Sequence, residues 1–195
     1  MSHKVVAANP RSGSKIDNLA LNIIKKFQPN ALWNDIFDVI KFFDCELEDF
    51  TQVVPDYRKL PAGIHGYTDA DTMESVISID LIDDQLQRPF CLSTIAHEIG
   101  HCIIHVPEFR IKKSLLKWTN GPSNNTLRMY RESEIPLYKN PEWQAWRFAG
   151  ALLMPAPSIL KVINSGYTED DISKKFRVSV SFVKARMRAL KLKTS

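Results

Sequence analysis

The stretch His97-Glu98-Ile99-Gly100-His101 is the part of the chain around which we expect the rest to fold. Residues four apart lie on one face of an α-helix, so the imidazoles of His97 and His101 can converge on one metal ion. Glu98 lies about 100° around the helix from His97, where a carboxylate that does not bind the metal can still reach a water molecule beside it. The H-E-x-x-H spacing therefore predicts part of a zinc site, provided that the stretch is helical.

The flanking residues predict that helix. Apolar side chains recur at spacings of three and four on the side away from the histidines: Leu92, Ile95, Ile99, Cys102, Ile103 and Val106. Pro89 fits the first turn of a helix, and Pro107 is expected to end it. We therefore predict an amphipathic helix over about 90–106.

His105 continues the polar row of His97 and His101 along the same helix. The rise over eight helical residues is about 12 Å, whereas zinc lies only about 2 Å from a ligating nitrogen. One ion is therefore badly placed to take both His97 and His105. We assign His105 a supporting or substrate-side role, and the alternative is an ordinary core or surface histidine.

A second helix is predicted over 141–154, and its first turn offers a third ligand. Asn140 suits the N-cap, Pro141 suits the first helical position, and Pro155 ends the run. Glu142 lies in the first turn, where its carboxylate can reach outward to a metal or complement the positive end of the helix dipole. The spacing alone leaves both interpretations of Glu142 open.

The two segments together resemble the ImmA/IrrE family of zinc metallo-endopeptidases. The first reads Ser93-Thr94-Ile95-Ala96-His97-Glu98-Ile99-Gly100-His101-Cys102-Ile103-Ile104-His105, and the second runs from Glu142-Trp143-Gln144-Ala145 through Phe148-Ala149 to Leu152-Leu153-Met154-Pro155. The resemblance extends more weakly to 73–80 and to the last helix. It implies that one zinc ion is bound by His97, His101 and Glu142, and that Glu98 is the catalytic residue.

Two features depart from the pattern of the family. Trp146 stands where the family usually has a small polar residue, so a contact that steadies a ligand is missing or comes from elsewhere. The connection from His101 to Glu142 is also longer than usual. Glu132 and Glu134 are therefore alternative ligands.

The rest of the chain predicts an α+β fold of the zincin type, with a small antiparallel sheet packed on the metal-binding helix. Supporting helices are expected over 16–27 and 30–43, after a loose tail over 1–13. Segments 62–67 and 73–79 predict an antiparallel hairpin, and 73–79 is the candidate for the strand whose free edge pairs with a substrate peptide.

The connection over 107–139 has the length of a lid or a binding loop. Within it, 120–125 predicts an exposed turn and 127–130 a short strand. Tyr130 and Tyr138 are candidate donors to an oxyanion.

The last part of the chain predicts a helix-turn-helix-like element. We divide the chain into a metallopeptidase domain over 1–157 and a C-terminal extension over 158–195 that packs on it. Three basic side chains on the second helix of this extension can be turned toward a DNA groove: Lys184, Arg186 and Arg188. A solvated basic face is the favoured interpretation, and DNA contact is the alternative.

The composition fits a cytoplasmic protein. The chain has 195 residues, of which 44% are hydrophobic, and a formal net charge of +4. Its three cysteines form neither an even framework nor a C-x-x-C motif, which indicates a reducing compartment. We find no apolar leader and no stretch of membrane-spanning length. An acidic cluster is expected to be solvated: Asp44, Glu46, Glu48 and Asp49.

The resemblance implies a zinc-dependent endopeptidase that cleaves a helix-turn-helix transcriptional repressor or an antitoxin, and so regulates transcription. Two alternatives from other classes are a DNA-binding regulator and a protein that binds a repressor without cutting it. Nothing in the sequence identifies the substrate.

Overall fold

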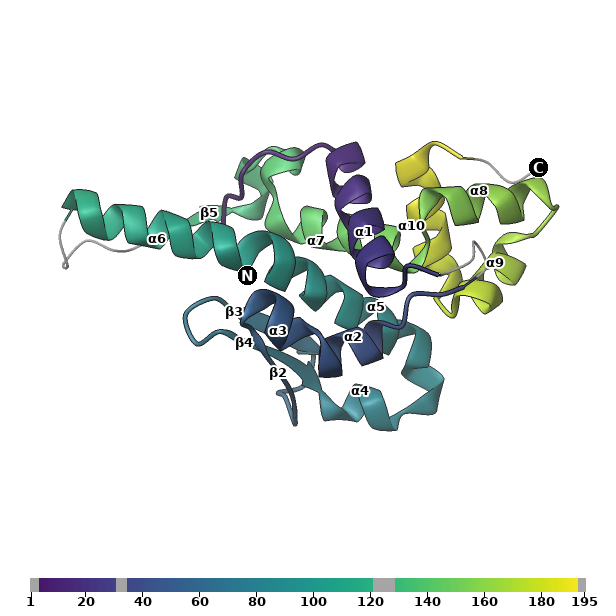
Figure 1. Ribbon diagram of the computed structural model, residues 1–195, viewed down its shortest axis with the longest axis horizontal. Coiled ribbons are helices and arrows are strands. Elements are labelled where there is room, and N and C mark those ends of the chain that lie inside the picture. Colours follow the sequence, from purple (N-terminus) through teal and green to yellow (C-terminus); the bar gives the residue numbers. More distant parts are fainter. Residues whose placement is uncertain (1–3, 31–34, 121–128, 193–195) are drawn as a thin grey trace.

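The computed structural model describes residues 4–30, 35–120 and 129–192, and its architecture is mixed α+β, as predicted (Figure 1). The strands are β1 (Lys4–Val6), β2 (Val54–Arg58), β3 (Gly66–Asp69), β4 (Glu74–Ser78) and β5 (Met129–Arg131). The helices are α1 (Gly13–Phe27), α2 (Val39–Cys45), α3 (Leu47–Thr51), α4 (Ile79–Asp83), α5 (Arg88–Gly100), α6 (Val106–Asn120), α7 (Pro141–Leu153), α8 (Ala156–Asn164), α9 (Glu169–Phe176) and α10 (Val180–Leu190). A π-helical turn (His101–His105) joins α5 to α6, and 3-10 turns lie at Gln85–Gln87, Glu132–Glu134 and Leu137–Lys139.

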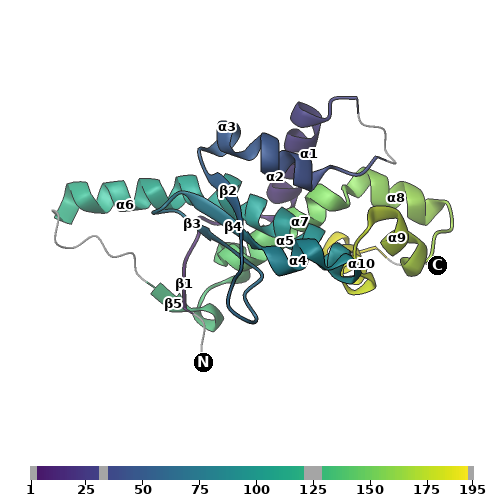
Figure 2. The same ribbon diagram turned by 90° about the horizontal axis from the view of Figure 1, so that it is seen from below.

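Helix α5 lies in the middle of the fold. It contacts α7, which in turn packs on α1, and on its other side it contacts β3 and β4 (Figures 1 and 2). Its apolar stripe is completely buried, as Ile95 and Ile99 illustrate, and it meets Phe148 and Leu152 of α7 in one core. Burial of each such side chain contributes about 1.5–3 kcal/mol, so α5 is among the most firmly held elements.

The prediction that Pro107 ends the helix was wrong. The helical path continues through the π turn His101–His105 into α6, where the backbone N–H of Val106 bonds to the carbonyl of His101. Proline has no N–H and its ring crowds the carbonyl four residues earlier, yet it is tolerated in the first turn of a helix. Pro107 lies in the first turn of α6, directly after the wider π turn, and π turns of this kind are common at functional sites.

The main sheet has the strand order β2-β4-β3. Strands β3 and β4 form the predicted antiparallel hairpin, and β2 runs parallel to β4. The prediction that 73–79 supplies a free edge was wrong, because β4 is the central strand and pairs on both sides. Its residues Val76 and Ile77 are fully buried, as expected for a central strand, and β3 provides the edge that lies next to α5.

The N-terminal segment is not a loose tail, in contrast to the prediction. Strand β1 pairs antiparallel with β5, with Val5 opposite Tyr130. The backbone N–H of Asn9 bonds to the carboxylate of Glu108 on α6, and Arg11 Nη1 donates to the same carboxylate at 2.7 Å. The buried Glu108 therefore anchors this segment to the helix that follows the π turn.

Two further predictions were partly wrong. The predicted helix over 30–43 begins only at Val39 within the described residues, because Asp38 caps α2 there, and 31–34 lies outside them. The first part of the predicted loop over 107–139 is instead helix α6, which projects from the body in Figures 1 and 2. The predicted strand is present as β5, whereas the predicted turn beyond Asn120 lies outside the described residues.

Helices α8, α9 and α10 follow α7. Thr168 and Asp171 form a capping box at the start of α9, and Ser179 caps α10. Arg186 belongs neither to the solvated basic face that was favoured nor to the alternative DNA-contacting surface, because this side chain is buried and donates to Asp17 at 2.8 Å and to the carbonyl of Met154 at 3.0 Å. A guanidinium that neutralises a buried carboxylate and the C-terminal end of α7 is not available to a phosphate or a base.

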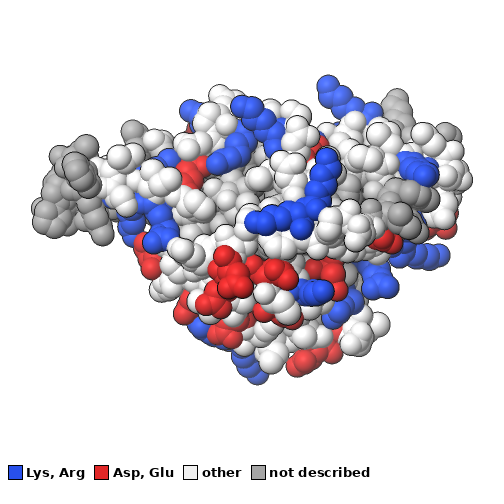
Figure 3. Space-filling model, viewed as in Figure 1, with Lys and Arg blue, Asp and Glu red and all other residues white. Residues whose placement is uncertain are grey.

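The surface carries the acidic cluster as expected. Acidic side chains gather over α2 and α3 in Figure 3, and Asp44, Glu48 and Asp49 are exposed. In the part of the chain that the structure describes, no helix is both long enough and apolar enough to cross a bilayer.

Candidate metal centre

The side chains of His97, His101 and Glu142 converge on one point between α5 and α7. The two imidazole Nε2 atoms are 3.1 Å apart, Glu142 Oε2 lies 3.2 Å from His97 Nε2, and Glu142 Oε1 lies 3.4 Å from His101 Nε2. A tetrahedral zinc ion with bonds of about 2.0–2.1 Å has ligand atoms about 3.3 Å apart. The donor set and its spacing therefore fit one zinc ion.

Close packing of α5 on α7 brings the carboxylate to the histidines. A Cβ atom at Gly100 would lie only 3.2 Å from Ala145 Cα and 3.3 Å from the carbonyl oxygen of Ala145. His97 and Glu142 each lie three residues before this contact, so the absence of a side chain at Gly100 lets the two ligand-bearing turns approach. Asn140 caps α7, and its side chain accepts hydrogen bonds from the backbone N–H groups of Glu142 and Trp143.

The alternative ligands do not join this group among the described residues. The Glu134 carboxylate accepts a hydrogen bond from the backbone N–H of Arg131 at 3.1 Å, whereas the Glu132 side chain lies outside the description.

Burial raises the pKa of the Cys102 thiol to about 12, so this thiol stays protonated.

The cluster favours a cation. Burial alone would raise the pKa of Glu142, but hydrogen bonds and charge interactions with His101 and His97 hold that pKa well below its ordinary value. Burial alone would lower the pKa of His101, but the hydrogen bond with Glu142 and the charges of Glu98 and Glu142 raise it. The carboxylate is therefore ionised at neutral pH, and it binds either protonated imidazole or a metal ion.

Glu98 is buried beside the cluster, and a residue of strand β3 holds its carboxylate by a hydrogen bond. Thr68 Oγ1 donates to Glu98 Oε2 at 2.7 Å, and Ser75 Oγ lies 3.1 Å from the same hydroxyl. Gly66, also on β3, leaves room for the carboxylate, because a Cβ atom there would come within 3.2 Å of Glu98 Cγ and Oε1. Thr68 lies just outside the segment 62–67 that was predicted as a strand, so this contact was not predicted. The signal for it was weak: Gly66 and Thr68 are two residues apart, which places them on one face of a strand.

His105 lies behind His101, and whether its role is supporting or substrate-side stays a prediction. It is 1% exposed, and its Nδ1 lies 3.1 Å from His101 Nδ1. On its far side, His105 Nε2 lies 3.2 Å from Gln144 Oε1. Gln144 was not singled out by the sequence, because a glutamine in the second turn of an apolar helix carries no spacing signal.

Trp146 takes the place of the polar contact that the family resemblance led us to expect. Its ring lies on His97 with a centroid distance of 4.2 Å and an interplanar angle of 38°. His97 Nδ1 is buried and has no hydrogen-bond partner among the described residues. His97 is therefore held by aromatic packing, whereas His101 is held by a hydrogen bond.

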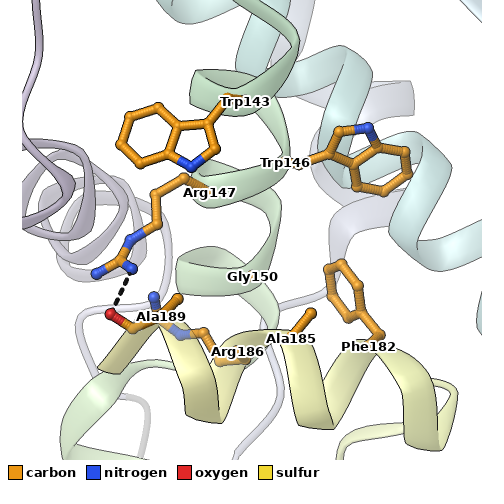
Figure 4. Close-up of a pocket in the computed structure, with 8 residues that line it drawn as sticks. All are labelled: Trp143, Trp146, Arg147, Gly150, Phe182, Ala185, Arg186 and Ala189. Atoms are coloured by element: carbon orange, nitrogen blue, oxygen red, sulfur yellow. Dashed lines mark hydrogen bonds between the residues drawn. The ribbon is translucent and has the colours of Figure 1, made fainter. Parts of the chain in front are cut away.

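Trp146 also forms one wall of a cavity of about 230 Å³ between α7 and α10 (Figure 4). The rings of Trp143 and Phe182 line the same cavity. Arg147, which also lines the cavity, donates to the carbonyl of Ala189 at 2.7 Å and to Asp17, so its charge is engaged within the protein. The surface that the cavity offers next to His97 is mainly aromatic.

The two tyrosines proposed as oxyanion donors precede the N-cap of α7 in the sequence. Tyr130 is on β5, and Tyr138 is half exposed, with its backbone carbonyl bonded to Gln144 Nε2 at 2.8 Å. Their catalytic role stays a prediction.

Comparison with known proteins shows a match to a protein family and a likeness to a solved structure. The profile of the family described as IrrE N-terminal-like domain, a peptidase family, matches residues 81–188, which include the whole cluster. A Mycobacterium tuberculosis transcriptional regulator of known structure is similar, with a TM-score of 0.59 and 16% identity over 89% of this chain and 46% of the regulator. That likeness shows the fold alone, and this chain spans about half the length of the regulator. No curated protein matches the chain.

Proposed function

Because the chain belongs to the peptidase family of IrrE N-terminal-like domains, we propose that it is a zinc-dependent endopeptidase with a zincin-like site. The observation that carries the proposal is the convergence of three donors, His97, His101 and Glu142, with Glu98 buried next to them. Two histidines and one glutamate are the protein ligands of one well-known class of catalytic zinc sites.

The chain supplies the groups that hydrolysis of a peptide bond requires. His97, His101 and Glu142 would hold the zinc ion, and the bound metal would supply an acidified water molecule, with a pKa lowered toward neutrality, as the nucleophile. Glu98 accepts a proton from the attacking water and returns it to the leaving amine as general base and then general acid. Thr68 holds this carboxylate in place through its hydroxyl. The free edge of β3, which carries both Thr68 and Gly66, can pair with an extended substrate segment.

Substitution of Glu98 tests the chemistry separately from metal binding. Glu98→Gln should retain one zinc ion per chain and lose peptide-bond cleavage, because an amide cannot act as the base. Glu142→Gln should lose zinc affinity by at least about tenfold, since a carboxylate ligand is removed. Glu134→Gln is the matched control and should bind zinc as the unaltered protein does. A fully active Glu98→Gln protein would contradict the proposal.

We propose further that the substrate is a helix-turn-helix repressor or antitoxin, as is typical of the family. The test is to incubate the protein with the helix-turn-helix protein encoded beside it, with and without a chelator, and to look for discrete fragments. Binding without fragments would favour the non-cleaving alternative. The DNA-binding alternative is weakened by the buried Arg186, which leaves Lys184 and Arg188 on α10, with Lys184 already 3.4 Å from Glu169.

A further inference from the structure

Three side chains form a line that leads away from the metal cluster into the protein. His101 points Nε2 at the cluster and Nδ1 at His105, with 3.1 Å between the two Nδ1 atoms. His105 Nε2 then lies 3.2 Å from Gln144 Oε1. Each imidazole can carry its proton on either nitrogen, and the hydrogen-bond partner of one nitrogen decides the state of the other. The state of the whole line therefore depends on how its last member, Gln144, is oriented.

The orientation of the Gln144 amide is determined by neighbouring groups that can only accept or only donate a hydrogen bond. Its Nε2 lies 2.9 Å from the carbonyl oxygen of Asn9 and 2.8 Å from that of Tyr138, and carbonyl oxygens only accept hydrogen bonds. Its Oε1 receives Arg11 Nη1 at 3.2 Å, and a guanidinium only donates. Both sides of the amide agree, so Gln144 presents an acceptor oxygen to His105.

The proton positions along the line follow. His105 Nε2 must carry a hydrogen to donate to Gln144 Oε1. His105 is buried and close to the cationic Arg11, where a second positive charge would be costly, so a neutral ring with an unprotonated Nδ1 is favoured. His101 Nδ1 then donates to His105 Nδ1. In the neutral His101 ring, the nitrogen without a proton is therefore Nε2, which faces Glu142 and His97.

We propose that Gln144 is a positioning residue which, through His105, fixes His101 in the tautomer whose Nε2 is free to bind the metal. This inference rests on the proposed function, because it assumes that His101 is a ligand. The two histidines are then held in different ways. The ring of His101 is oriented by the hydrogen bonds through His105 to Gln144. The ring of His97, whose Nδ1 has no partner among the described residues, is oriented by packing against Trp146. A partner of this kind typically contributes 10–100-fold to metal affinity.

Two substitutions at Gln144 separate this role from simple packing. Gln144→Met removes the acceptor toward His105, whereas Gln144→Glu keeps an acceptor oxygen there. Both lose the donations to Asn9 and Tyr138, so a purely structural role would weaken both variants alike. We expect the zinc dissociation constant, measured by competition with a chromophoric chelator, to rise about 10–100-fold in Gln144→Met and by less than about threefold in Gln144→Glu. Equal weakening of the two variants, or no weakening in Gln144→Met, would overturn the inference.

A second measurement needs no variant and therefore does not depend on how the variants fold. In the zinc-loaded, 15N-labelled protein, the ring nitrogen spectrum should show a proton on His101 Nδ1 and a proton on His105 Nε2. A proton on His105 Nδ1, or metal bound to His101 Nδ1, would overturn the inference. Absence of zinc binding in the unaltered protein would instead refute the proposed function, so the two failures are distinguishable.

Discussion

At the scale of single residues, the site depends on atoms that approach closely rather than on the motif alone. The H-E-x-x-H spacing predicted which side chains share a helix face. In the structure, the Nε2 atoms of His97 and His101 are 3.1 Å apart. The partner of Glu98 comes from a strand 30 residues earlier. No local pattern encodes such a contact, which is why Thr68 could not be predicted.

Thr68 gives a residue-scale prediction. Thr68→Val removes the hydroxyl that donates to Glu98 Oε2 while keeping the shape of the side chain. A hydrogen bond to a charged group contributes about 1.5–3 kcal/mol, so we expect kcat to fall on the order of tenfold or more. Zinc content should stay at one ion per chain. The matched control is Thr72→Val in the exposed loop before β4, and equal rates for Thr68→Val and the unaltered protein would show that Thr68 does not position the base.

At the scale of elements, local signals predicted the helices that carry ligands but not the path between them. The caps and prolines of α7 and the stripe of α5 were sufficient because these signals act within one or two turns. Pro107 misled the prediction because the π turn before it admits a proline that an uninterrupted α-helix would exclude. The pairing of β1 with β5 joins two three-residue strands that are far apart in sequence, and short strands carry too few residues to show alternation.

Gly100 gives an element-scale prediction. A methyl group at this position meets the backbone of Ala145 at 3.2 Å, and backbone cannot move aside as a flexible side chain can. Gly100→Ala should therefore lower the free energy of unfolding by about 1–3 kcal/mol, despite the better helix propensity of alanine. The separation of α5 from α7 should also weaken zinc binding. Urea denaturation and chelator competition measure the two effects, and an increase in stability would show that the close approach is not needed.

At the scale of the whole molecule, one largely buried group of charges joins distant parts of the chain. Asp17 on α1 receives Arg147 from α7 at 2.6 Å and Arg186 from α10 at 2.8 Å, so one carboxylate ties three helices together. The sequence predicted Arg186 as a surface residue because a basic side chain on an amphipathic helix is usually solvated. Its partner lies 169 residues earlier, and only the tertiary structure reveals it.

The pH dependence of the metal-free protein follows from the cluster. The lowered pKa of Glu142 contributes stability that is present above its ordinary value of 4.5 and is lost as the pH falls through the folded value. The raised pKa of His101 contributes stability that is fully present below its ordinary value of 6.5 and is lost as the pH rises through the folded value. The stabilising contribution of this pair should therefore be largest between these two pH values.

Urea unfolding in the presence of a chelator measures this contribution as the difference between the unaltered protein and Glu142→Gln. We expect the difference to shrink both below pH 4.5 and above pH 6.5. Added zinc should remove the alkaline loss, because the metal replaces the proton as the cation at the site. A difference that grows steadily from pH 6.5 to higher pH without metal would contradict the assigned charge states.

The most direct test of the account is the position of zinc itself. Crystals of the zinc-loaded protein, measured on both sides of the zinc absorption edge, should show one anomalous peak within about 2.0–2.2 Å of His97 Nε2, His101 Nε2 and a carboxylate oxygen of Glu142. A peak at another place, or a peak between the two histidines with the Glu142 carboxylate turned away, would contradict it.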